Sequence, residues 1–129
     1  NEKIPIKIEI NKKNILVFLI SLILIILWCY FSGIGSFSYQ NNDFNVRNAV
    51  FRDLINYDWP IIFNFNDRIS KIVGYETVGF VYYFSYFLPS ALIGKLFGIG
   101  SANLFLYLYS VLVLFLIIFL IRNKFNKNL

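Results

Sequence analysis

The polar loop from Gly33 to Glu76 holds most of the side chains in this chain that could do chemistry. Asp43, preceded by Asn41 and Asn42, could act as a general base on an acceptor hydroxyl or hold a divalent cation against a diphosphate. The same carboxylate stands where a helix N-cap would stand, and one side chain can serve both roles. Asp43 is therefore the strongest candidate for a catalytic residue, with helix capping as the simpler role.

Five other residues are candidates for substrate binding: Arg47, Arg52, Asp58, Tyr82 and Tyr83. The two guanidinium groups could bind phosphate, although positions five apart on a helix point in somewhat different directions. Asp58 has a simpler role open to it, as a turn-forming acid shortly before a proline. The tyrosines could stack on sugar rings or belong to an aromatic belt at a membrane interface.

Composition excludes several kinds of site. The chain has no histidine, which excludes His-based acid–base catalysis and the usual zinc sites within these residues. The one cysteine, Cys29, has no second thiol to pair with and is predicted to pack between helices. No metal site is predicted and the cofactor is unknown, with a divalent cation left open. No P-loop, CxxC, HExxH or GxSxG pattern occurs.

The elements that must position the loop are apolar helices. The chain is 58% hydrophobic and 20% aromatic, with a mean hydropathy of +0.64. The runs Ile15–Phe31, Val78–Phe97 and Ala102–Ile121 contain a single charge, Lys95, which is expected to reach lipid head groups. At about 1.5 Å per residue, each run is long enough to cross a hydrocarbon core of roughly 30 Å. The predicted fold is all-α and membrane-integral, with three transmembrane helices.

The predicted organisation has six parts: a cytoplasmic N-terminal segment (1–14), transmembrane helix 1 (15–31), an external loop (32–77), transmembrane helix 2 (78–98), transmembrane helix 3 (101–121) and a basic tail (122–129). Three spans are too few to enclose a substrate cavity alone, so we expect the tail to lead into the remainder of a longer chain.

Two structured segments are predicted within the external loop. From Asp43 to Trp59, apolar residues recur at helical spacing, which indicates a short amphipathic helix on the membrane surface. These residues are Val46, Ala49, Val50, Leu54 and Tyr57. Further on, Ile61–Phe65 and Arg68–Val73 flank Asn66-Asp67, which is a weak signal for a small hairpin.

The distribution of charge predicts the topology. Lys12 and Lys13 before the first span place the N-terminus in the cytoplasm and the loop outside. A cleaved signal peptide is the competing interpretation of the same run, and it also leaves the loop outside. Three crossings put the basic tail outside, against the positive-inside rule, unless the segment around Pro89 only dips into the membrane.

The formal net charge of +5 does not indicate nucleic acid as a partner. The basic residues lie mainly at the predicted membrane edges, where they meet lipid phosphates. Nucleic-acid binding would need a contiguous basic face on a folded water-soluble domain.

A family resemblance rests on several short segments in a fixed order: Asn42-Asp43, Asn48–Ile55 (NAVFRDLI), Trp59-Pro60, Tyr82–Pro89 (YYFSYFLP), Gly94–Gly98 (GKLFG) and Ile121–Phe125 (IRNKF). This layout resembles the N-terminal part of GT-C membrane glycosyltransferases, a superfamily that includes the lipid-A aminoarabinose transferase, the protein O-mannosyltransferases and uncharacterised bacterial members. Many members have paired acids where this chain has Asn42-Asp43.

The resemblance implies transfer of a sugar from a polyprenyl-phosphate donor outside the cytoplasm, with Asp43 near the reacting centre. The expected partners are membrane lipid, the lipid-linked donor and the remainder of the chain, and the expected location is a bacterial inner membrane. The alternative is a non-catalytic membrane subunit, flippase-like or involved in envelope assembly, whose loop is structural. Which sugar and which acceptor are used stays open.

Overall fold

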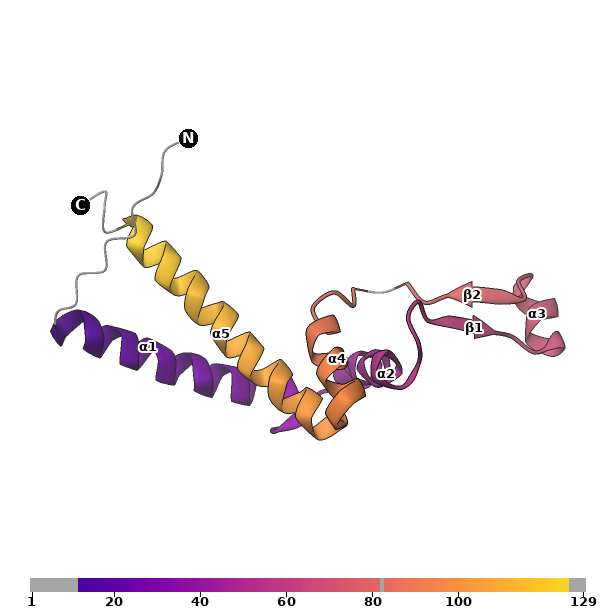
Figure 1. Cartoon of the computed structure of the whole chain (residues 1–129), viewed down its shortest axis with the longest axis horizontal. Coiled ribbons are helices and arrows are strands. Elements are labelled where there is room, and N and C mark those ends of the chain that lie inside the picture. The colour runs from indigo at the N-terminus through magenta and orange to yellow at the C-terminus, as the bar shows by residue number, and fades with distance from the viewer. Residues whose placement is uncertain (1–11, 82, 126–129) are drawn as a thin grey trace. The chain divides into compact units, whose positions relative to one another are not determined.

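The computed structural model describes residues 12–81 and 83–125. The chain divides into two compact units. Unit 1 consists of the residues up to Tyr39 together with those from Tyr107 onward, and unit 2 is Gln40–Leu106. Much of the predicted N-terminal segment (1–14), the end of the basic tail (122–129) and Tyr82 lie outside the described residues. Figure 1 labels the elements.

Unit 1 is built from two long helices, α1 (Lys12–Phe31) and most of α5 (Ile99–Phe125), with the short 3-10 helix η1 (Ile34–Ser36) after α1. Both helices are long and apolar enough to span a membrane. At about 1.5 Å per residue, α1 is roughly 30 Å long, the thickness of a bilayer core. The predicted helices at 15–31 and 101–121 are therefore present, and each extends beyond its predicted bounds.

The two helices of unit 1 run antiparallel and share a small core. Ile25 and Cys29 of α1 are buried against Val111 of α5, so the predicted packing role of Cys29 is confirmed. Near one end, the Tyr107 hydroxyl donates a hydrogen bond of 3.0 Å to the Ile26 carbonyl oxygen. Near the other, the Phe18 ring contacts the rings of two phenylalanines of α5, with centroids 6.3 and 5.5 Å apart.

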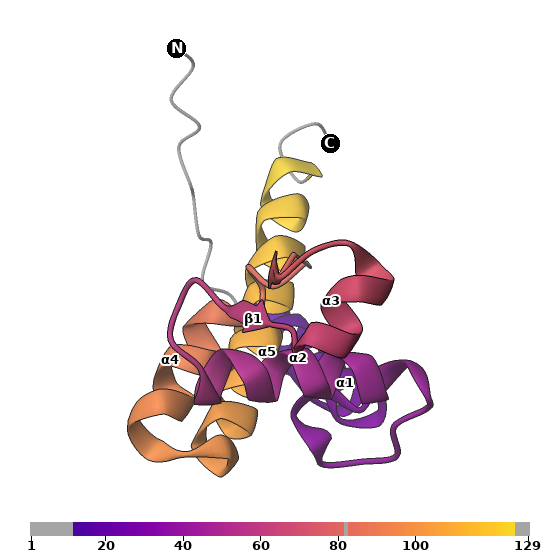
Figure 2. The ribbon, with the colours of Figure 1, turned by 90° about the vertical axis from the view of Figure 1, so that its right-hand side faces the viewer.

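Unit 2 is centred on α2 (Asp43–Asn56) and α4 (Leu88–Phe97), which lie side by side (Figure 2). The apolar residues Val50, Phe51 and Leu54 of α2 are buried. The buried residues of α4 are all small: Ser90, Ala91 and Gly94. A methyl group added at Gly94 would lie 2.7 Å from Ile55 Cγ1 of α2 and 2.9 Å from Ala102 Cβ of α5. The two helices therefore approach closely because α4 presents small side chains.

Between α2 and α4, the chain forms a two-stranded antiparallel hairpin whose connection contains a helix at the far end of the strands (Figure 1). Strand β1 (Ile62–Asn64) pairs with β2 (Thr77–Gly79), with Phe63 opposite Val78. Helix α3 (Asp67–Val73) lies between the strands. The Asn66 side chain caps α3 by accepting a hydrogen bond of 3.0 Å from the Ile69 amide.

The predicted hairpin is present, but its second strand was placed wrongly. Arg68–Val73 is α3, because Asn66 acts as a helix N-cap and not as part of a turn. Gly74, at φ 80°, ends this helix in the left-handed conformation that favours glycine. The chain is thereby released into β2.

The structure also corrects the prediction of one continuous helix over 78–98. Val78 lies in β2, and the helix in this region is α4, which has only ten residues. Ten residues rise about 15 Å, half of a bilayer core. Pro89 stands in the first turn of α4, the part of a helix where proline is tolerated because its missing N–H would have no partner there. Proline also restricts the backbone conformation of the residue before it. Three transmembrane helices are therefore not confirmed.

Candidate functional site

The predicted catalytic residue, Asp43, lies in the first turn of α2 and is exposed. Asn42 takes the N-cap position, so the predicted capping position is displaced by one residue. The Asp43 amide donates to the Asn41 side-chain oxygen at 3.2 Å. Within the described part of the chain, the Asp43 carboxylate has no hydrogen-bond partner. A negative charge in the first turn still stabilises a helix through its dipole.

The segment that leads into α2 is held by polar contacts. The Asn48 amide group donates to the Gln40 side-chain oxygen at 2.7 Å, which ties the approach to the second turn of the helix. The Phe44 amide donates to the Asn41 carbonyl oxygen at 3.1 Å. These bonds position the start of α2 and leave the Asp43 carboxylate open on the surface.

Arg47 is the one arginine candidate that α2 brings close to Asp43. The two residues are four apart on the helix and so are neighbours on one face. The Arg47 guanidinium carbon lies 5.3 Å from the centroid of the Phe44 ring, which limits its freedom. An exposed carboxylate and an exposed guanidinium therefore share one face of the first turns of α2.

The remaining described candidates are not brought to this face. Arg52 is exposed but lies nine positions after Asp43, which on an α-helix is the opposite side of α2. Asp58 is exposed beyond the C-terminal end of the helix, and Tyr83 is exposed near the start of the segment that precedes α4. Among the described candidates, only Arg47 therefore shares a face with Asp43.

The amphipathic helix predicted for the loop is present, and its packed face agrees in part with the predicted one. Val50 and Leu54 of the predicted apolar face are buried, whereas Val46, Ala49 and Tyr57 are exposed. The buried residues are those that contact α4, among them Phe51, whose ring centroid lies 5.4 Å from that of Phe87. The buried face of α2 thus packs on protein.

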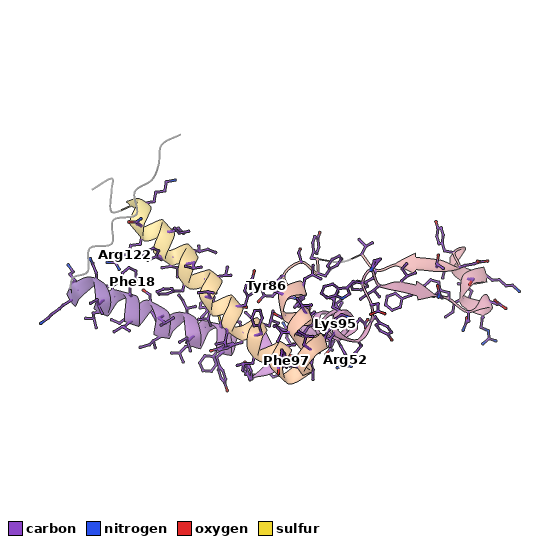
Figure 3. All side chains as sticks on the ribbon, in the orientation of Figure 1. Phe18, Arg52, Tyr86, Lys95, Phe97 and Arg122 are labelled. Carbon is purple, nitrogen blue, oxygen red and sulfur yellow. The ribbon has the colours of Figure 1, made fainter. Side chains whose placement is uncertain are left out.

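Sequence reasoning missed a contact of Lys95 with the C-terminal end of α2 (Figure 3). The Lys95 ammonium donates to the Tyr57 carbonyl oxygen and lies 5.5 Å from the centroid of the Trp59 ring. The Trp59 indole N–H in turn donates to the Leu54 carbonyl oxygen at 2.8 Å. Lys95, for which the sequence predicts a head-group contact, therefore has a protein partner. No local pattern signals this pairing because the residues are distant in the sequence.

A metal site cannot be located on this surface. In the ranges 12–81 and 83–125, no three residues of the types His, Cys, Asp and Glu come together as a cation would require. The arrangement at α2 can instead offer a carboxylate as a proton acceptor and a guanidinium as an anion partner. Comparison of the chain with protein-family models, with curated proteins and with solved structures gives no match.

Proposed function

We propose that this chain is part of a membrane glycosyltransferase of the GT-C type, in which α1 and α5 anchor unit 2 at the outer membrane surface. Asp43 is the catalytic residue of this proposal and Arg47 its phosphate-binding partner. The donor is a sugar linked to polyprenyl phosphate. Two anchoring helices enclose no substrate cavity by themselves, so the other walls of the active site come from further membrane segments.

The proposed reaction is a displacement at the anomeric carbon. The Asp43 carboxylate takes the proton of the acceptor hydroxyl, and the acceptor oxygen forms the new bond to the anomeric carbon. The bond from that carbon to the phosphate oxygen breaks, and polyprenyl phosphate leaves with the electron pair. Arg47 stabilises the departing phosphate. Attack from the face opposite the leaving group inverts the configuration of the sugar.

One observation carries this proposal. The Asp43 carboxylate is exposed in the first turn of a helix that packs against α4, and in the sequence it follows shortly after a helix that can span a membrane. Within the described residues, the chain thus holds an acid without a hydrogen-bond partner at a defined position on α2. Arg47 adds a cationic group one turn away on the same face.

The test separates catalysis from helix stabilisation. Membranes with the full-length protein are supplied with polyprenyl-phosphate carrying a radiolabelled sugar, and transfer is measured at matched protein levels. Asp43→Asn keeps the size of the side chain but removes the general base, so transfer should fall roughly 10²- to 10⁴-fold. The matched control is Asp67→Asn, since Asp67 is also an exposed acid in the first turn of a unit 2 helix. Transfer by the Asp67 variant should stay within about twofold of the unmodified protein.

A non-catalytic membrane subunit is the second candidate, and a specific observation favours it. Arg52, Asp58 and Tyr83 do not converge on Asp43, and the buried face of α2 serves to pack α4. If Asp43→Asn and Asp67→Asn leave transfer equally high, Asp43 only stabilises α2. If the unmodified protein transfers no sugar from any polyprenyl-phosphate donor, the structural role replaces the catalytic one.

A further inference from the structure

The ends of α1 and α5 in unit 1 gather the basic residues of two distant parts of the sequence. Lys12 and Lys13 open α1, and Arg122 and Lys124 lie in the last turn of α5. The Arg122 guanidinium donates a hydrogen bond of 2.7 Å to the Asn14 side-chain oxygen. Because the helices are antiparallel, these four residues lie at the same end of the pair, and we call them the basic end.

Arg122 is the fixed member of the basic end. Its guanidinium carbon lies 4.7 Å from the centroid of the Phe18 ring (Figure 3). The Nη2 atom bonds Asn14, whereas the Nη1 atom is buried and has no hydrogen-bond partner among the described residues. Asn14 and the Phe18 ring thus hold the guanidinium in place, so its positive charge stays at the basic end.

The two helices supply no negative charge for the basic end. Neither Lys12–Phe31 nor Ile99–Phe125 contains an aspartate or a glutamate. The helices that carry these cations are also the two that are long and apolar enough to span a membrane. Acceptor oxygens at the end of a membrane-spanning pair are most readily supplied by lipid phosphates.

We infer that the basic end binds the phosphate groups of anionic phospholipids in the cytoplasmic leaflet, so that α1 and α5 each cross the membrane once and the basic end lies inside. This topology removes the conflict that three crossings create, because Arg122 and Lys124 now obey the positive-inside rule together with Lys12 and Lys13. Unit 2, which lies between the two helices in the sequence, is then outside. The inference does not depend on a catalytic role for Asp43.

The first part of the test measures topology in intact cells. Single cysteines are introduced at Ile72, which is exposed on α3, and at Asn123, which lies at the basic end, with Cys29→Ala to clear the background. A membrane-impermeant maleimide should label the cysteine at position 72 in intact cells. It should label the cysteine at position 123 only after the membrane is permeabilised. Labelling at position 123 in intact cells would overturn the inference.

The second part measures the lipid preference of the full chain in reconstituted bilayers. The probes are spin-labelled phosphatidylglycerol and spin-labelled phosphatidylcholine, and the readout is the ratio of their association constants. Each exposed cation near the surface contributes roughly a fivefold preference for anionic lipid, so Lys12→Gln and Lys124→Gln should each lower the ratio by about that factor. Both residues are exposed, so the variants should fold.

Two controls decide what the lipid measurement means. Arg68→Gln with Lys71→Gln removes two charges from α3 and should leave the ratio unchanged. An equal loss in this control would show that net charge alone sets the preference. Inorganic phosphate, compared with chloride at the same ionic strength, should not displace spin-labelled phosphatidylglycerol. Displacement would show a site for free phosphate in place of a lipid site, and would also overturn the inference.

Discussion

Units 1 and 2 differ in the size of the side chains at their helix contacts. In unit 1, α1 and α5 meet through large groups such as Phe18, Ile25 and Tyr107, while most of their other apolar side chains are exposed. In unit 2, the large residues of α2 pack against the small residues Ser90, Ala91 and Gly94 of α4. The contrast teaches that unit 2 is held by close approach of its helices, whereas the helix pair of unit 1 leaves most of its apolar surface uncovered.

The largest effect should come from a charge on the exposed face of α1. Leu24 is 61% exposed in α1, and Ile72 is 80% exposed in α3. If α1 spans a bilayer, Leu24→Asp should cost about 2.5–3.5 kcal/mol of insertion free energy. If α3 lies in water, Ile72→Asp should change stability by less than about 0.5 kcal/mol. The measurement is the fraction of protein resistant to carbonate extraction, and equal effects of the two variants would break the proposed difference between the units.

A smaller effect should follow from crowding the contact between α2 and α4. Gly94→Ala places a methyl group 2.7–2.9 Å from atoms of Ile55 and Ala102, so unit 2 should lose about 1–3 kcal/mol. Gly100→Ala is the control, since no other side chain or distant backbone atom lies within 4 Å of a Cβ added there. Alanine is also more favourable than glycine inside a helix, by up to about 1 kcal/mol. Thermal unfolding is followed by Trp59 fluorescence with Trp28→Phe as the background. A Gly94 variant as stable as the Gly100 variant would mean that close approach does not hold unit 2 together.

The smallest of these effects should come from Lys95. Lys95→Met keeps the apolar part of the side chain but loses the hydrogen bond to Tyr57 and the contact with the Trp59 ring. The expected cost is about 1 kcal/mol. Arg68→Met removes an exposed cation from α3 and should be close to neutral. Urea unfolding of both variants, again followed by Trp59 fluorescence, measures how much these contacts stabilise unit 2. An unchanged unfolding midpoint in the Lys95 variant would show that they contribute nothing.

The parts of the fold that could be predicted depend on local properties of the chain. Long apolar runs without charge predict α1 and α5, since uninterrupted apolar runs of about 18 residues are typical of membrane-spanning helices. The start of α2 at Asp43 follows from an acid beside two asparagines before a helical period. The same local signal made Asn66-Asp67 ambiguous, because these residue types favour both turns and helix starts.

The parts that could not be predicted depend on contacts between distant residues. Average hydropathy over 78–98 does not distinguish one long helix from a strand, an irregular segment and a short helix that starts near Pro89. The face of α2 that is buried is decided by α4, so Val46 could not be known to be exposed. At the candidate site, helical spacing alone relates Arg47 to Asp43 and excludes Arg52. The positions of Asp58 and Tyr83 depend on the course of the chain beyond α2.

The pairing of β1 with β2 has a consequence for how unit 2 forms. The connection between α2 and α4 runs from 57 to 87, and docking of the two helices must close this loop. Pairing of the strands joins Ile62 to Gly79 and removes more than half of the connection from the loop that has to be closed. Because the entropy of closure grows with the logarithm of loop length, this shortening lowers the cost of docking by roughly 0.6–1 kcal/mol. A hairpin that makes no contribution to the candidate site can thus speed the meeting of the helices that position it.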